Sequence, residues 1–164
     1  MDSPFDWEEF IKEKSKKLFY YVLKFVSTKE DAEDIVQSTF IKLLQNQHKL
    51  DEEYYERWIY RVAHNKSMNL LKKNKLIWKK TEEITLSTKA YTIDEYENKD
   101  EIIKQEIRKH FLRLKEKQAL ALELQFYQKK TYKEIANIMG LSVPAVESLL
   151  VRAKKEMKKN MQGF

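Results

Sequence analysis

The sequence predicts an all-α protein with two small helical domains joined by a flexible linker, the C-terminal domain being a helix-turn-helix. Three observations lead to this prediction. The 164 residues include only 2 Gly, 2 Pro and no Cys, so few residues interrupt helices and no disulfide constrains the chain. Apolar residues recur at helical spacing through two long regions. A stretch rich in acids, Thr and Ser separates those regions. We therefore expect domains over residues 1–80 and 102–164, with a linker over 81–101.

Three amphipathic helices are predicted in the first domain. The first places apolar residues on one face between residues 7 and 25. The second follows a candidate capping box, Ser27 with Glu30, and keeps an i, i+3, i+4 apolar pattern over 32–44. The third is expected over residues 51–71, after a short polar loop. Together these helices predict a small helical bundle.

The second domain ends in two short helical patterns hinged at one glycine. Helical periodicity first runs over residues 102–126. Thr131 and Glu134, three positions apart, then form a capping box at the start of a helix. Gly140 can adopt the positive φ that ends a helix, and Ser142 is a suitable N-cap for the next one. This order of features is typical of a helix-turn-helix, although an ordinary helical hairpin shares it.

The last of these helices divides into an apolar stripe and a polar face. Its apolar residues recur between Val146 and Met157 and can fix the angle of the helix. A helix that reads DNA in the major groove needs this division, with its polar face near the N-terminus. The polar face carries Ala145, Glu147, Ser148, Arg152 and Lys155.

Charge is distributed unevenly along the chain. Lys and Arg total 32 against 26 acids, a formal net charge of +6, which favours a polyanionic partner. Residues 57–80 contain eight Lys or Arg and no acid, whereas residues 82–106 contain eight acids and three Lys. The acidic stretch either keeps the linker solvated or occupies a basic nucleic-acid channel until DNA arrives.

An acidic ridge is predicted on the second helix. Asp31, Asp34 and Gln37 lie at helical spacing, opposite the apolar stripe. Acids in a first helical turn also suit the helix dipole, so the ridge alone indicates stability as readily as function. A metal site is a weaker interpretation, because no His or matching loop supports these carboxylates.

Basic, amide and aromatic residues alternate on the third helix. Lys and Arg can neutralise phosphates, while aromatic and amide side chains can stack on or hydrogen-bond to unpaired bases. This pattern suits single-stranded or melted DNA, although Trp58 is equally compatible with core packing. The candidate phosphate contacts are Arg61, Lys66, Lys72, Lys73, Lys75, Lys79 and Lys80, and the candidate base contacts are Trp58, Tyr60, His64, Asn65 and Asn69.

The sequence gives little support for an enzyme, a metalloprotein or a membrane protein. His48, His64 and His110 lie far apart, and there is neither a Cys-ligated zinc site nor a Gly-rich phosphate loop. No run approaches the ~20 apolar residues that a membrane span requires. The first residues lack the basic and apolar regions of a secretory signal. We expect a protein of the cytoplasm that needs no cofactor and no metal.

Three segments together resemble the bacterial RNA polymerase sigma factors of the extracytoplasmic-function type, in the sigma-70 family. Residues 31–40, DAEDIVQSTF, are similar to the family's DAED-x-x-Q-x-x-F segment. Residues 58–65, WIYRVAHN, are similar to its W-L-x-x-I-A-x-N segment, and residues 131–155 to its region-4 helix-turn-helix. The three segments occur in family order and cover nearly the whole chain.

This resemblance implies a sigma factor that catalyses no reaction itself. It would bind core RNA polymerase and direct promoter recognition, DNA melting and transcription initiation. Asp31, Asp34 and Gln37 would contact the clamp of the beta-prime subunit, and the apolar side of region 4 the flap of the beta subunit. Whether an anti-sigma factor binds is left open by the sequence.

The resemblance also implies two sets of promoter contacts. The minus-10 element would be held and melted by Asn46, Trp58, Arg61, His64, Asn65, Asn69 and Lys72. The minus-35 element would be read by Thr131, Ser142, Ala145, Glu147, Ser148, Arg152 and Lys155.

Departures from the family pattern concern sequence specificity. His64 lies where Arg is frequent, Asn69 where Asp is frequent, and Glu147 and Leu149 where basic residues often occur. Promoter sequence is therefore not transferred, and we interpret Leu149 as part of the apolar stripe. The alternative function is a helix-turn-helix regulator that binds operator DNA as a dimer, which would need no polymerase-binding ridge.

Overall fold

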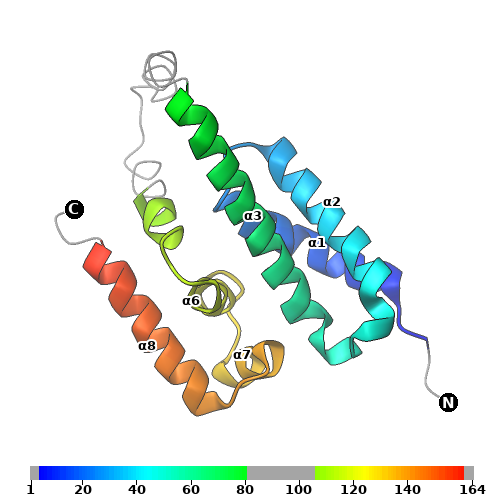
Figure 1. Ribbon diagram of the computed structural model, residues 1–164. Coiled ribbons are helices and arrows are strands. Elements are labelled where there is room, and N and C mark those ends of the chain that lie inside the picture. Colours follow the sequence, from blue (N-terminus) through cyan, green and yellow to red (C-terminus); the bar gives the residue numbers. More distant parts are fainter. Residues whose placement is uncertain (1–3, 81–105, 161–164) are drawn as a thin grey trace.

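The computed structural model of the protein describes residues 4–80 and 106–160 (Figure 1). All regular secondary structure in these two ranges is helical. The α-helices include α1 (Trp7–Leu23), α2 (Lys29–Asn46), α3 (Tyr55–Lys80), α6 (Glu116–Leu122), α7 (Tyr132–Met139) and α8 (Val143–Asn160). Short turns of other helix types are η1 (Gln47–Lys49), η2 (Glu52–Tyr54) and η3 (Glu123–Tyr127). The all-α prediction is confirmed, and the predicted linker over 81–101 lies outside the described residues.

Helices α1, α2 and α3 pack against one another as a three-helix bundle (Figure 1). Asp6 caps α1, its carboxylate accepting a hydrogen bond from Glu9 N at 3.0 Å. The cap of α2 is Thr28, and the prediction of Ser27 is wrong by one position. Thr28 has extended backbone and its Oγ1 accepts from Asp31 N at 3.1 Å, the three-residue separation that a cap requires.

The start of α3 also differs from the sequence prediction. The helix was expected to begin near Asp51, but Glu52–Tyr54 form a 3-10 turn and the α-helix begins at Tyr55. Asp51 keeps extended backbone at the start of that turn. Tighter 3-10 turns are frequent at helix ends, and a periodic apolar pattern does not separate them from the helix that follows.

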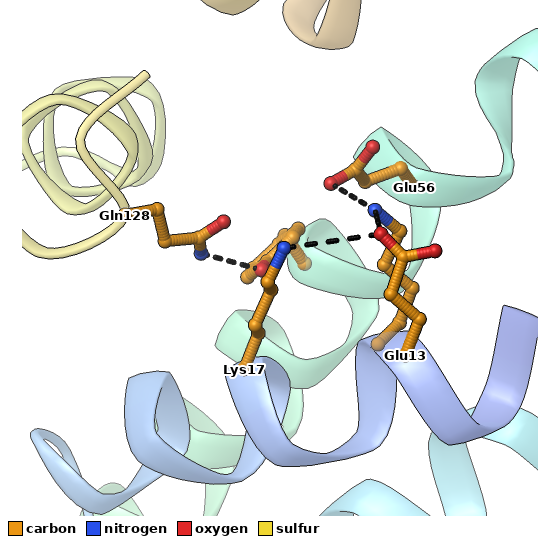
Figure 2. A network of polar contacts seen from close by, with 6 residues as sticks. Glu13, Lys17, Glu56 and Gln128 are labelled. Atoms are coloured by element: carbon orange, nitrogen blue, oxygen red, sulfur yellow. Dashed lines mark hydrogen bonds and ion pairs between the residues drawn. The ribbon is translucent and has the colours of Figure 1, made fainter.

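A charged side chain interrupts the apolar face of α1 and is paired inside the bundle. Lys14 is 8% exposed. Its ammonium lies 3.1 Å from Glu56 Oε1 of α3 and 3.3 Å from Glu13 Oε1 (Figure 2). Lys14 lowers the pKa of the Glu13 carboxyl below its ordinary value. A buried cation is tolerated here because two carboxylates replace its hydration.

The helix-turn-helix is formed as predicted. Thr131 Oγ1 accepts from Glu134 N at 3.2 Å while Glu134 Oε1 accepts from Thr131 N at 3.0 Å, which completes the capping box. Gly140 has φ 67° and ψ 36°, a left-handed conformation that glycine adopts without steric cost. Ser142 Oγ then accepts from Ala145 N at 3.2 Å and caps α8. Helices α7 and α8 meet at 98°, within the range typical of this motif.

Helix α6 lies between α3 and α8 and contacts both (Figure 1). The apolar stripe of α8 packs on it, with Val146, Leu150 and Ala153 at most 1% exposed. After α6 the chain forms a π-helical turn, in which Gln128 N donates to Glu123 O at 3.1 Å. This turn lies on the connection between α6 and α7.

The two domains share one apolar core. Phe111, the last of the helical residues 106–111, is 2% exposed and its ring lies 5.5 Å from that of Phe25. It also contacts Tyr21 of α1 edge to face, with ring centroids 6.5 Å apart. Tyr21 in turn packs on Tyr60 of α3 at 5.2 Å. The described part of the second domain is therefore docked on the first.

Among residues 4–80 and 106–160, no single helix combines the length and apolar character of a membrane span. Helices α7 and α8 meet those criteria only as a pair, and that pair is sharply bent.

Candidate nucleic-acid and polymerase surfaces

Helix α8 presents the predicted minus-35 contacts on its outer side. Ser142 caps the helix, and the side chains that follow it on this side are exposed, except Ala145, which is half-buried. Leu149 is half-buried and packs against the core, so its interpretation as part of the apolar stripe is confirmed. Thr131 lies at the start of α7 with its hydroxyl and backbone N–H inside the capping box. The exposed set is Ser142, Glu147, Ser148, Arg152 and Lys155.

Helix α3 carries an exposed polar stripe along one side. Arg61, Asn65, Asn69 and Lys72 are all exposed, and their spacings of four, four and three residues place them on one helical face. Trp58, one turn before Arg61, is half-buried and packs against the core. A cation at each end and amides between them suit a strand with a phosphate backbone and unpaired bases.

His64 does not lie on this exposed stripe. It is 5% exposed, with Nδ1 3.4 Å from Tyr21 OH and its ring 5.0 Å from that of Phe25. Burial lowers the pKa of His64 to about 4, because the protein interior disfavours the charged imidazolium. Tyr60, also a predicted base contact, is 1% exposed and lies on the same inner face with Ala63 and Ser67, so neither ring is accessible to DNA in this structure.

Asn46 is half-buried at the C-terminal end of α2. Its Nδ2 donates to Lys42 O at 2.8 Å, so the amide helps to satisfy one of the last carbonyls of the helix. Its side-chain oxygen has no such bond within the described part of the chain, and Asn46 remains a predicted DNA contact at the edge of the loop before α3.

The acidic ridge lies beside the basic helix. Asp34 is exposed and Asp31 half-buried. Both line a cleft of about 430 Å³ whose opposite wall is formed by Lys66, Asn69 and Lys73 of α3. The structure therefore places part of the predicted polymerase contact and part of the predicted minus-10 contact on the two walls of one cleft.

Gln37, the third member of the ridge, faces a different depression. It lines a groove of about 760 Å³ between α1 and α2. Three large apolar side chains of this groove are exposed, Tyr20 by 53%, Ile41 by 51% and Leu44 by 39%. Leu44 is the last residue of the apolar pattern over 32–44, and the structure leaves it exposed. An exposed apolar groove of this kind is typical of a protein-binding surface, and sequence reasoning missed it.

A set of polar contacts connects the two domains. Lys24 Nζ at the end of α1 lies 2.6 Å from Glu123 Oε2, and its ammonium sits over the Tyr127 ring at 4.0 Å. Arg57 Nη1 of α3 donates to Met139 O at 2.8 Å, at the end of α7 directly before the turn of the helix-turn-helix. Burial raises the pKa of the Glu123 carboxyl, an effect that Lys24 opposes. These contacts join residues that no local sequence pattern relates.

Two further hydrogen bonds extend this set. Gln128 Nε2 donates to Tyr60 OH at 2.7 Å (Figure 2), and Arg108 Nε donates to Lys24 O at 3.1 Å. Burial raises the pKa of the Tyr60 hydroxyl, so the group stays protonated. Within residues 4–80 and 106–160, no three His, Cys, Asp or Glu side chains are grouped to hold a metal ion.

Two family descriptions match the chain. Residues 10–77 match "Sigma-70 region 2", and residues 104–157 match "Sigma-70, region 4". The first range contains α2 and nearly all of α3, and the second contains the helix-turn-helix. The exposed stripe of α3 and the outer face of α8 thus belong to different matched regions.

Relatives match over most of their length. The chain is 28% identical over 159 residues to "RNA polymerase sigma factor YlaC" of Bacillus subtilis (strain 168), covering 94% of this chain and 91% of that protein. It is 25% identical over 141 residues to "ECF RNA polymerase sigma factor SigM" of the same organism, covering 86% of each.

Solved structures show the same fold. CnrH, solved with the cytosolic domain of CnrY, matches with a TM-score of 0.58 and 18% identity, covering 93% of this chain and 84% of that one. RpoE of Bartonella quintana, solved with the anti-sigma factor NepR, matches with a TM-score of 0.53 and 18% identity, covering 96% and 98%. Since the region-2 and region-4 descriptions together match most of the chain, and the Bacillus subtilis sigma factors match it over most of their length, the protein belongs to the sigma-70 family of bacterial RNA polymerase sigma factors, in its extracytoplasmic-function group, with a role in promoter recognition.

Proposed function

We propose that the protein binds core RNA polymerase through α2, melts and holds the minus-10 element along α3, and reads the minus-35 element with α8. It catalyses no bond change itself and acts in the cytoplasm, where transcription takes place. The observation that carries this proposal is the presence of two separate exposed faces suited to DNA in one chain. One is the acid-free stripe of α3, and the other is the outer face of a capped helix-turn-helix.

The physical roles of the two faces differ. The stripe on α3 mixes Arg61 and Lys72 with Asn65 and Asn69, which suits phosphates and unpaired bases rather than a closed duplex. Helix α8 has an exposed outer face that carries Ser148, Arg152 and Lys155, and an angle fixed by its buried stripe, which suits major-groove reading. The cleft shared by Asp34 and Lys66 brings polymerase binding close to strand binding.

Transcription in vitro tests this function directly. Purified protein is added to core RNA polymerase and a library of promoter DNA fragments, and RNA synthesis is measured. We expect start sites that depend on the protein and on sequence near minus 10 and minus 35. Stable operator binding by a dimer, without any polymerase-dependent RNA, would instead favour a regulator.

Arg152→Ala is expected to weaken binding to a minus-35 duplex. Arg152 is exposed on the outer face of α8, and loss of one phosphate contact lowers the slope of log K against log salt by about 1. Fluorescence anisotropy titrations at several salt concentrations measure that slope. Arg152→Lys keeps the charge and is the matched control, so its slope should equal that of the unmodified protein. A slope unchanged in Arg152→Ala would remove this contact.

Asp34→Lys is expected to weaken binding to core RNA polymerase by at least about tenfold, since inverting one charge of a complementary pair replaces attraction with repulsion. Asp34 is exposed on α2, so the change leaves the fold intact. Surface-immobilised core polymerase measures the affinity. Glu53→Lys, an equal charge change at an exposed position on η2, is the control. Wild-type affinity in Asp34→Lys would exclude the acidic ridge as the polymerase contact.

A further inference from the structure

Helix α8 places an acid where a helix-turn-helix reads bases. The N-terminal residues of the second helix of this motif contact base edges in the major groove. Over residues 143–150, the exposed side chains are Val143, Pro144, Glu147 and Ser148. Glu147 is the one charged side chain in this range, because the cations Arg152 and Lys155 follow further along the helix.

Glu147 lies at one edge of the outer face of α8. It directly follows Val146, which is 0% exposed and belongs to the buried stripe. An α-helix of about 10–12 Å diameter nearly fills a major groove about 12 Å wide. Side chains at the edge of the outer face therefore meet either base edges or the phosphates that line the groove.

No interaction along the helix explains a carboxylate at this position. Helix α8 begins at Val143, so Glu147 lies beyond the first turn, where the favourable effect of the helix dipole on acids ends. The residues three and four positions away are Val143, Pro144, Leu150 and Val151. None of them is a cation that forms an ion pair on the helix surface. Unless a donor of the DNA meets it, this acid weakens binding to every sequence.

Cytosine supplies such a donor in the major groove. Guanine presents two acceptors there, and thymine presents an acceptor beside its methyl group, so neither offers a donor to a carboxylate. Adenine has an amino donor, but its N7 acceptor also lies on this edge. Cytosine has the N4 amino donor and no acceptor on the same edge. It is therefore the base that a glutamate carboxylate meets without repulsion.

A second exposed side chain extends this surface. Val151 is 64% exposed and lies four residues after Glu147, about 6 Å further along the helix. The apolar group that bases present in the major groove is the thymine methyl. With α8 along the groove, Val151 is placed to contact a thymine about two base pairs from the cytosine, at about 3.4 Å per pair.

We propose that Glu147 selects cytosine in the minus-35 element by accepting a hydrogen bond from its N4 amino group, and that Val151 adds a preference for a nearby thymine. This inference rests on the proposed function, because it assumes that α8 reads duplex DNA at minus 35. Arg152 and Lys155 then supply attraction to phosphates, which acts equally on all sequences. Affinity and base preference are thus carried by different residues of one helix.

Selection from random DNA tests this assignment. The full-length protein is assembled with core RNA polymerase and mixed with duplexes that carry randomised blocks near minus 35 and minus 10, each about ten base pairs or one helical turn long. Bound duplexes are then sequenced. We expect one minus-35 position at which cytosine is enriched at least about fivefold over each other base, the discrimination typical of one specifically read base pair.

Glu147→Gln decides whether the carboxylate reads a base. Glutamine pairs with the amino group and N7 of adenine, so the enriched base at that position should change from cytosine to adenine. If Glu147 instead lies against phosphates, the same substitution removes a repulsion and strengthens binding to all sequences alike. That outcome, or an unchanged preference for cytosine, would overturn the assignment.

Glu156→Gln is the matched control. It makes the same change at another exposed position of α8, beyond Arg152 and Lys155, and it should leave every base preference unchanged. The same shift in Glu156→Gln as in Glu147→Gln would contradict direct reading by Glu147. Circular dichroism verifies that each variant is folded.

Val151→Gln tests the thymine contact separately. It should lower the enrichment of thymine within about two base pairs of the selected cytosine, since the apolar contact with the methyl group is lost. The preference for cytosine should remain. Unchanged enrichment of thymine would remove the role of Val151.

The unmodified protein separates this inference from the function beneath it. If polymerase with the protein enriches no duplex over polymerase alone, the proposed function fails. If a minus-35 sequence is enriched but contains no cytosine whose selection depends on Glu147, the function stands and the assignment to Glu147 fails.

Discussion

Replacing Leu150 with alanine is expected to lower the free energy of unfolding by about 2–5 kcal/mol, because it leaves a cavity in a packed core. Leu150 is 1% exposed and lies in the stripe of α8 that packs on α6. Urea denaturation followed by circular dichroism measures the change. The same variant should lose binding to a minus-35 duplex, since the angle of α8 depends on this contact.

Val151→Ala is the control for Leu150→Ala. Val151 is the next residue on the same helix but is 64% exposed, so its truncation should change the free energy of unfolding by less than about 0.5 kcal/mol. Equal effects of the two substitutions would contradict the packing of α8 described above. Loss of stability in Leu150→Ala with full DNA binding would show that the angle of α8 does not depend on this stripe.

Lowering the pH from 6.5 to 4 is expected to destabilise the protein through His64. Burial lowers the pKa of His64 to about 4 in the folded protein, whereas an unfolded chain has a histidine pKa of about 6.5. Between these values the unfolded state binds more protons, so the free energy of unfolding falls as the pH falls, by up to about 3 kcal/mol. Urea denaturation at a series of pH values measures this slope.

His64→Gln should flatten that slope, because the amide does not titrate. His48→Gln is the control, since His48 is exposed on η1 and should leave the slope unchanged. Burial raises the pKa of Glu123, so that carboxyl favours the folded state at low pH and opposes the imidazole. The difference between His64→Gln and the unmodified protein isolates His64, and identical slopes would show that the ring is not buried as described.

Local signals in the sequence predicted the elements whose ends are fixed by local hydrogen bonds. Thr131 with Glu134 and the left-handed Gly140 are examples, because each acts on residues three or four positions away. The sequence predicts the cap of α2 one residue too early, at Ser27 instead of Thr28, because both residue types are good caps. Their backbone conformations, which the sequence does not display, decide between them.

The sequence predicts those parts of the candidate site whose residues recur at helical spacing along one helix. The exposed side of α3 with Arg61, Asn65 and Asn69 is given by spacing alone. For His64 and Tyr60, the spacing of four residues predicts that both rings lie on one face of the helix, but it does not show that this face is the buried one. The pairing of Arg57 with Met139, 82 positions apart, depends on how the domains dock, and no periodic pattern within one helix contains that information.

The π-helical turn that follows α6 sets the direction in which the chain continues toward α7. A carbonyl that bonds to the fifth residue, as Glu123 O does with Gln128 N, accommodates one residue more than an α-helix would. An added residue rotates later side chains by about 100° about the axis. Phe126 and Tyr127 lie within this turn and are 48% and 53% exposed, while Gln128 directly after it donates to Tyr60 OH. The length of the turn therefore sets where Gln128 lies, and with it one of the contacts between the two halves of the molecule.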